Sequence, residues 1–208
     1  MTYNDINYRE IQRGDYPALE SIVRKTWGYD KFCSPRIARK MSRLYLAACL
    51  ASQTFIRVAE LHGTPVGVIM AKNEKTYRTP PRYAARMAAA MASIYLTAEG
   101  RRVARFFQDI DKLDRELLKE SATAFDGELA FFAVAEAARG SGIGRGLFTR
   151  AVDYLRGEKL RNFYLFTDST CNYGFYEHCG MRRLCERDVC LNPARPEKMR
   201  FFLYGHNL

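Results

Sequence analysis

The chain has 208 residues, of which 48% are hydrophobic, and a formal net charge of +10. This composition excludes a disordered chain and suits one domain with a sizeable core. No uncharged apolar run is long enough to cross a bilayer, and residues 1–5 lack the basic start and apolar core of a signal peptide. We therefore expect a cytoplasmic protein with no membrane partner.

Cysteine usage indicates reduced thiols and no metal centre. The chain has six cysteines without a CxxC pair, and its three histidines form no evident ligand set. A zinc site would have to combine residues at irregular spacing, namely Cys171, His178, Cys179 and Cys185. We expect no bound metal.

The first third of the chain predicts strands and helices in alternation. Ser34 precedes Pro35, and this pair suits a helix start because proline fits the first helical turn. Residues 62–64 read as the turn of a β-hairpin. The expected elements are a strand over 6–11, a helix from about Asp15, a helix over Ser34–Ala51, and hairpin strands over Thr54–Glu60 and Pro65–Lys72.

The next segment, about 73–123, is predicted as an insertion made of a helical hairpin. Tyr83–Leu96 is rich in alanine and methionine, which favour helix, and Arg101–Lys119 carries one amphipathic stripe. We expect Gly100 to break the two helices apart.

A strand, a glycine turn and a helix follow in direct succession. Glu128–Val134 is a short apolar run typical of a buried strand, and residues 143–155 have the apolar spacing of a helix. Between them lies the segment Arg139–Leu147, which contains four glycines. Glycine permits positive φ, and the free N–H groups at a helix start attract anions. The segment therefore predicts a pyrophosphate site.

Two common glycine motifs do not match this segment. A P-loop needs Lys and Ser or Thr after its last glycine, but Gly146 is followed by Leu147 and Phe148. The dinucleotide fingerprint needs glycine at position 145 or 147, where Arg145 and Leu147 stand. A nucleoside triphosphate, a nicotinamide and a flavin are thus disfavoured.

The motif that does match is (Arg/Gln)-x-x-Gly-x-(Gly/Ala), with Arg139, Gly142 and Gly144 in place. At this point the chain resembles the GNAT N-acetyltransferase superfamily, whose turn holds coenzyme A. A second segment, Phe175–Met181, is similar to that family's FYEKxGF pattern. The resemblance implies that Tyr176 protonates the leaving thiolate; the alternative is a packed tyrosine with a hydrogen-bonded hydroxyl.

The resemblance implies a mixed α/β (α+β) acyl-CoA N-acyltransferase fold: a central, mostly antiparallel sheet with splayed central strands flanked by helices, in a single domain over 1–208 with the helical insertion. The implied activity is transfer of acetyl from acetyl-CoA to a primary amine by direct attack in a ternary complex. We keep two alternatives: a non-catalytic acyl-CoA-binding module, and a basic protein that binds or acts on nucleic acid such as aminoacyl-tRNA.

The attacking amine must lose a proton, and a carboxylate is the usual acceptor. Glu128 falls where histone-type members of the family have their general base, and it is our first candidate. The alternatives are a solvated Glu128 at the start of its strand, Glu136 as a reserve base, or a chain of water molecules.

The cofactor-binding residues that the resemblance implies come from the strand, the turn and the last motif. The strand would align the pantetheine arm through its backbone. Asn172 is a weaker candidate, because residues 168–172 also look like a helix start, and Ser169 stands where the family often has asparagine. The set is Phe132, Ala133, Val134, Arg139, Gly140, Ser141, Gly142, Ile143, Gly144, Arg145 and Asn172.

The sequence defines the partners of the protein less closely than its expected cofactor. The phosphates of coenzyme A explain part of the basic charge, and the arginine clusters at 101–105 and 182–187 match no nucleic-acid motif, so nucleic acid is not the expected partner. The acceptor stays open between a polyamine, an amino acid, an aminoglycoside and a peptide N-terminus. We favour the insertion as an embellishment or lid, with a homodimer surface as the alternative. Four aromatics before it are expected in the core or at the acceptor wall: Trp27, Tyr29, Phe32 and Tyr45.

Overall fold

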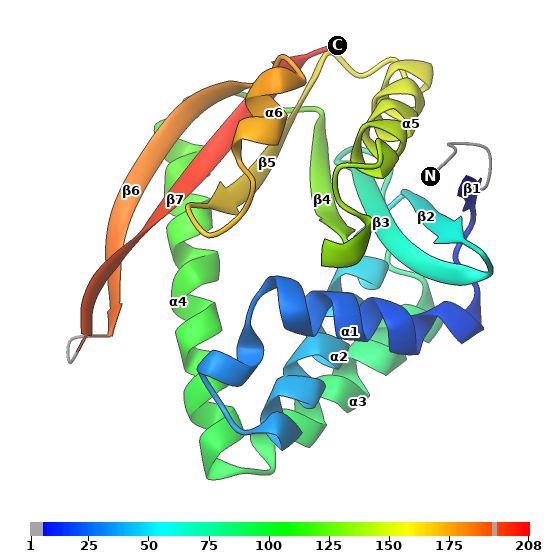
Figure 1. The fold of residues 1–208 in the computed structure, drawn as a ribbon. Coiled ribbons are helices and arrows are strands. Elements are labelled where there is room, and N and C mark those ends of the chain that lie inside the picture. The colour runs from blue at the N-terminus through cyan, green and yellow to red at the C-terminus, as the bar shows by residue number, and fades with distance from the viewer. Residues whose placement is uncertain (1–5, 193–194) are drawn as a thin grey trace.

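The computed structural model describes residues 6–192 and 195–208 (Figure 1). Residues 1–5, on which the signal-peptide prediction rests, lie outside them. The described part contains a seven-stranded sheet with the order β1-β2-β3-β4-β5-β7-β6. Its strands are β1 (Ile6–Arg9), β2 (Phe55–Leu61), β3 (Thr64–Asn73), β4 (Gly127–Val134), β5 (Asn162–Asp168), β6 (Arg182–Asn192) and β7 (Arg195–Asn207).

Helices cover both faces of this sheet (Figure 1). One face carries α1 to α4 and the other carries α5, and the mixed α/β class expected from the sequence is confirmed. The α-helices are α1 (Tyr16–Thr26), α2 (Pro35–Ala51), α3 (Pro81–Tyr95), α4 (Ala98–Glu120), α5 (Ile143–Gly157) and α6 (Gly174–His178), with short 3-10 turns η2 (Arg13–Asp15), η3 (Tyr29–Lys31) and η4 (Glu136–Ala138).

The helix start at Ser34 and the hairpin turn at residues 62–64, both predicted from the sequence, are confirmed. The Ser34 hydroxyl accepts a hydrogen bond from the Ile37 amide and caps α2 directly before Pro35. The β2–β3 turn is made by His62 and Gly63, which have φ of 49° and 74°. Two successive left-handed residues match the twist of the strands that they connect.

The central strands β4 and β5 diverge, as the family resemblance implies. They are the one parallel pair among the described strands, and only Gly127 with Phe163 and Glu128 with Tyr164 are in register. Beyond Glu128, β4 stays paired with β3 but leaves β5 (Figure 1). One edge of β4 is therefore open in the middle of the sheet.

A β-bulge in β4 changes which side chains face the helices. Lys72 is in register with Glu128, whereas Met70 is in register with Phe131, so β4 advances three residues while β3 advances two. Leu129 packs with the α5 core, but Phe131 packs with the core under α1 and α2. The bulge therefore places Glu128 and Phe131 on the same face.

The insertion is helical, as predicted, but its two helices do not lie along each other. They meet at a corner: α3 packs on α2, and α4 runs along the strands at the far end of the sheet (Figure 1). The break falls at Leu96 and Thr97, not at Gly100. Gly100 lies in the first turn of α4, where an added Cβ would clash with the Ile94 carbonyl oxygen.

Helix α4 is held to the sheet by apolar contacts. Leu113 and Leu117 pack with Tyr164, Phe201 and Leu203 of β5 and β7 in a third core cluster. The long β6–β7 hairpin that completes this region was not predicted from the sequence. Within the described residues, no helix combines the length and apolarity needed to cross a membrane.

Truncation of Leu117 tests whether α4 belongs to the core. Leu117 is fully buried, so Leu117→Ala should lower the free energy of unfolding by about 2–5 kcal/mol in urea titrations. Exposed Lys112 on the same helix is the control, and Lys112→Ala should leave stability within about 0.5 kcal/mol. Equal effects of the two changes would contradict the packing of α4 against β5 and β7.

Candidate functional site

The glycine turn has the backbone that anion binding requires. Gly140 and Gly142 have φ of 78° and 77°, a region in which L-residues are strained. Gly142 is the N-cap of α5, and the Ser141 hydroxyl donates to the Ala138 carbonyl at 2.6 Å. Gly140 and Gly142 are exposed. The free amides at the start of α5 are therefore accessible to a phosphate.

Aromatic contacts bring the glycine turn and the second motif together. A Cβ on Gly144 would lie 3.5 Å from Phe132 of β4 and 3.6 Å from Phe175 of α6. The ring centroids of Phe132 and Phe175 are 5.4 Å apart, and those of Phe132 and Tyr176 are 6.3 Å apart. The Phe132 ring thus joins the start of α5 to Tyr176.

Tyr176 is half-buried, and its hydroxyl has no hydrogen-bond partner among the described residues. Burial raises the pKa of this phenol, and nearby Cys171, Cys179 and Asp168 raise it further. The phenol therefore keeps its proton and can donate it. The alternative of a packed tyrosine with a satisfied hydroxyl does not describe this residue.

Glu128 is not the solvated side chain of the alternative interpretation. Its carboxylate lies 3.3 Å from the Lys72 ammonium, which also pairs with Glu74 at 2.9 Å. The Glu128 side chain is 20% exposed. Burial raises the pKa of Glu128, whereas the Lys72 cation opposes that rise. A carboxylate whose pKa is raised in this way accepts a proton more readily than a solvated one.

The reserve candidate lies elsewhere. Glu136 is exposed on η4, after the last residue of β4, whereas Glu128 is near that strand's first residue. A strand rises about 3.3 Å per residue, so the two carboxylates belong to opposite ends of β4. The structure groups Glu128, and not Glu136, with the Lys72 network.

The open edge of β4 contains the three residues expected to align the pantetheine arm. Phe132, Ala133 and Val134 are in register with Ile69, Val68 and Gly67 of β3 on one edge only. No residue of β5 pairs with them on the other edge. Sheet pairing on both sides is therefore excluded, and the backbone groups on this edge have no strand partner among the described residues.

The remaining candidates around the turn are on the surface. Ile143 is buried and anchors the first turn of α5. Arg139 donates from Nε to the Val134 carbonyl at 3.3 Å, and Arg145 is exposed on the first turn of α5. Both cations can approach a pyrophosphate on the free amides of the turn.

Asn172 does not cap a helix. Helix α6 begins after Tyr173 without a side-chain cap, and Asn172 is exposed, with its carbonyl accepting from the Phe175 amide. Asp168 instead bonds the Thr170 amide and closes a turn before the helix. Ser169 is committed to β7, because its hydroxyl accepts from the Arg200 amide. The helix start predicted at residues 168–172 is therefore wrong, because α6 begins at Gly174.

The four early aromatics divide between core and surface. The rings of Trp27, Tyr45 and Phe131 form one cluster with centroid distances of 4.8 to 5.6 Å. Tyr29 is buried, and Phe32 is 48% exposed beside Phe106. The Trp27 cluster lies on the Glu128 face of β4, because Phe131 shares that face.

Sequence reasoning missed several polar residues near Glu128. Lys72 and Glu74 come from the end of β3, and the Tyr164 hydroxyl on β5 donates to Glu74 at 3.1 Å. The charge of Glu128 also raises the pKa of Asp114 on α4. The sequence does contain a signal for Asp114, because it is a carboxylate inside an otherwise apolar helical stripe. No group of three or more metal-ligating side chains among the described residues is arranged to hold a metal ion.

Comparisons with known proteins agree with this geometry. The model of the acetyltransferase (GNAT) family matches residues 16–181. Among solved structures, SsHAT has a TM-score of 0.61 at 16% identity, covering 98% of both chains. A ribosomal-protein-alanine N-acetyltransferase from Brucella melitensis has a TM-score of 0.57 at 15% identity, covering 97% of this chain and 99% of its own.

A third structure, the ribosomal-protein-S18-alanine N-acetyltransferase from Escherichia coli, has a TM-score of 0.54 at 11% identity, covering 97% of this chain and 93% of its own. No curated protein matches the sequence. At these identities the structures show a shared fold, and the family assignment rests on the match over 16–181. The chain belongs to the GNAT acetyltransferase family, whose general reaction is acyl transfer dependent on acetyl-CoA.

The left-handed glycine at the start of α5 provides a direct test of cofactor binding. Gly142→Ala places a Cβ on a residue with φ of 77° and should weaken acetyl-CoA binding about tenfold through strain of about 1–3 kcal/mol. Calorimetric titration measures this. Gly157→Ala, at the other end of α5 with no atom within 4 Å of its Cβ, should bind normally. Unchanged affinity in Gly142→Ala would show that the turn does not hold the cofactor.

Proposed function

We propose that this chain transfers the acetyl group of acetyl-CoA to a primary amine by direct attack in a ternary complex. The observation that supports this most strongly is the convergence on β4 of the glycine turn, an unpaired strand edge, Tyr176 and Glu128. Each group alone has a structural explanation. Together they supply an anion site, a binding edge, a proton donor and a proton acceptor around one divergence.

In this proposal the start of α5 binds the pyrophosphate of acetyl-CoA. The free amides of Gly142, Ile143 and Gly144 point along the helix axis, and Arg139 and Arg145 supply positive charge at the surface. The pantetheine arm then follows the open edge of β4 and pairs with its backbone, as an added strand would. Asn172 contributes at most a surface contact.

Glu128 accepts the proton that the acceptor ammonium must lose. The neutral amine nitrogen then attacks the thioester carbonyl, forming the C–N bond and placing negative charge on oxygen. A free amide on β4 can donate to that oxygen, an interaction whose loss typically costs about 3 kcal/mol of transition-state stabilisation. The C–S bond breaks as the carbonyl re-forms. The nitrogen releases its second proton to solvent, and a proton from solvent restores Tyr176 after the thiolate has been protonated.

Tyr176 donates its phenolic proton to the departing thiolate. Its raised pKa keeps that proton in place before the C–S bond breaks, and its contact with Phe132 holds it beside β4. The products are the N-acetylated amine and coenzyme A. The reaction as proposed uses no metal ion and no nucleic-acid partner. It needs acetyl-CoA as a free co-substrate, which suits a cytoplasmic location.

Two other functions give different results in the same assays. A non-catalytic acyl-CoA-binding module would be stabilised by acetyl-CoA in thermal unfolding but would release no thiol with any amine. A nucleic-acid-binding protein would bind tRNA with a steep salt dependence. Selective stabilisation by acetyl-CoA, with NAD and ATP as controls, together with amine-dependent thiol release, distinguishes the enzyme from both.

The role of Tyr176 can be measured by removal of its hydroxyl. Tyr176→Phe should lower kcat by about 10²-fold or more while the Kd for acetyl-CoA is unchanged, because only the proton donor is lost. Tyr173, in the same segment, packs on Phe202 at 5.0 Å, and Tyr173→Phe is the matched control with expected normal turnover. An equal fall in kcat for both variants, or a parallel change in Kd, would remove Tyr176 from the mechanism.

The role of Glu128 appears in the pH profile. Glu128→Gln should lower kcat/KM by about 10²-fold and remove its acidic limb, whereas Glu136→Gln should behave as wild type. Lys72→Met removes the cation that lowers the pKa of Glu128, so the acidic limb should move to higher pH. Loss of activity in Glu136→Gln alone, or a limb that moves to lower pH in Lys72→Met, would contradict this assignment.

A further inference from the structure

One carboxylate interrupts the apolar stripe by which α4 packs on the rest of the molecule. Asp114 follows Phe107 by seven residues, about two helical turns, so both lie along the same edge of α4. Phe107 packs edge-on against Tyr29, with ring centroids 5.4 Å apart. Asp114 is half-buried, and within the described residues it has no hydrogen bond and no ion pair.

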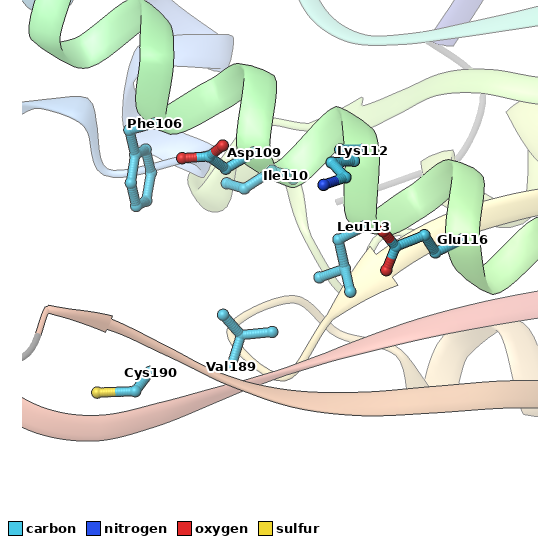
Figure 2. Close-up of a pocket in the computed structure, with 8 residues that line it drawn as sticks. All are labelled: Phe106, Asp109, Ile110, Lys112, Leu113, Glu116, Val189 and Cys190. Atoms are coloured by element: carbon cyan, nitrogen blue, oxygen red, sulfur yellow. The ribbon is translucent and has the colours of Figure 1, made fainter.

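The opposite edge of α4 has a different environment. There Phe106, Asp109 and Leu113 line a groove against Val189 and Cys190 of β6 (Figure 2). Asp109 is exposed in this groove. Glu116 also lines this groove and pairs with Arg187. Asp109 and Asp114 thus lie on different edges of the same helix, and the two can be compared directly.

Strand alternation places a second carboxylate opposite Asp114. Side chains two apart share a face, so Tyr164, Phe166 and Asp168 of β5 point the same way. Tyr164 and Phe166 belong to the cluster that packs on α4, and Asp168 therefore faces α4 from beyond the point where β4 leaves β5. The third carboxylate, Glu128, lies beside Tyr164, with which it is in register.

These carboxylates outnumber the cations that face them. Lys72 is shared between Glu128 and Glu74, and Arg115 on α4 is exposed. Burial raises the pKa of Asp114 to about 7, and the charges of Asp111, Glu128 and Asp168 contribute to the rise while Arg115 opposes it. In a chain of net charge +10, this is a local excess of negative charge.

A buried hydroxyl borders the same region. Tyr29 is 1% exposed, and its hydroxyl has no hydrogen-bond partner among the described residues. It lies near the Cys49 thiol of α2, and that thiol is in turn within the field of Glu128. An unsatisfied buried hydroxyl is costly unless a ligand pairs with it. The Tyr29 hydroxyl and the Asp114 carboxylate are both groups that an ammonium donor would satisfy.

We propose that Asp114 binds a second positive group of the acceptor, so that the acceptor is an amine with at least two cationic groups. This inference rests on the proposed acetyl transfer and names its substrate class. Glu128 would serve the amine that reacts, and Asp114 would hold the distant ammonium. An amino-acid acceptor is disfavoured, because its carboxylate would enter the field of three like charges.

Three acceptors that share a five-carbon amine chain test the proposal. Cadaverine has two ammonium groups, n-pentylamine has one, and lysine adds a carboxylate to the cadaverine framework. At pH 8, kcat/KM from thiol release should favour cadaverine over n-pentylamine by about tenfold or more, as expected for a charged hydrogen bond. Lysine should be poorer than cadaverine by at least the same factor.

Variants separate recognition from structure. Asp114→Asn should bring the cadaverine to n-pentylamine ratio close to one without changing the KM for acetyl-CoA, and Asp114→Glu should restore much of the ratio. Asp109→Asn, on the groove edge of α4, should keep the wild-type ratio. In the wild type the ratio should fall between pH 8 and pH 6, because Asp114 with a pKa of about 7 becomes neutral while both ammonium groups stay charged.

Each negative result has a distinct meaning. A wild-type ratio near one, or an Asp114→Asn variant that loses activity equally on all three acceptors, overturns the role of Asp114. If acetyl-CoA binds but no acceptor is turned over, the affinities of cadaverine and n-pentylamine are measured by titration into the complex with coenzyme A. Equal affinities overturn the inference. If acetyl-CoA gives no thermal stabilisation, the proposed function itself fails. Circular dichroism confirms that each variant is folded.

Discussion

The departure of β4 from β5 after two paired residues is the constraint around which the rest of the structure is arranged. A strand that loses its neighbour in the middle of a sheet leaves backbone N–H and C=O groups without partners, which is unfavourable unless something else pairs with them. In the proposed reaction the pantetheine arm of acetyl-CoA supplies those partners. The β-bulge in the same part of β4 places Glu128 on the face that carries α1 and α2. The loss of pairing with β5 thus opens the binding edge, and the bulge sets the face on which the Glu128 carboxylate lies.

Several polar groups near this divergence are held in positions that do not favour stability. The Tyr176 and Tyr29 hydroxyls have no protein partner in the described part, and burial raises the pKa values of Glu128 and Asp114. Such arrangements cost free energy of folding and are typical of sites whose partners arrive with a ligand. The extensive apolar contacts of α1, α2 and α5 with the sheet stabilise the scaffold that holds them.

The insertion has a part in this arrangement that its composition alone does not show. Helix α4 packs on β5 and β7 through Leu113 and Leu117, and in the same turns it carries Asp114, whose pKa is raised by the charges of Glu128 on β4 and Asp168 on β5. These contacts show α4 packed on the sheet, and in the proposed recognition of the acceptor the insertion contributes Asp114. In the proposed reaction the acetyl-CoA site is built from other elements, so acceptor recognition and cofactor binding use different parts of the chain.

What the sequence determined by itself is the local structure: the capped start of α2 at Ser34, the left-handed turn at His62 and Gly63, the glycine turn at the start of α5, and the segment that contains Tyr176. These depend on φ preferences and on hydrogen bonds between residues close in the chain. Only the tertiary structure decided that Glu128 pairs with Lys72, that α3 and α4 meet at a corner, that the β6–β7 hairpin completes the sheet, and that the charge of Glu128 reaches Asp114. Those relations depend on a bulge, on close packing at Gly100 and on contacts between residues far apart in sequence, for which a single chain has no periodic signal.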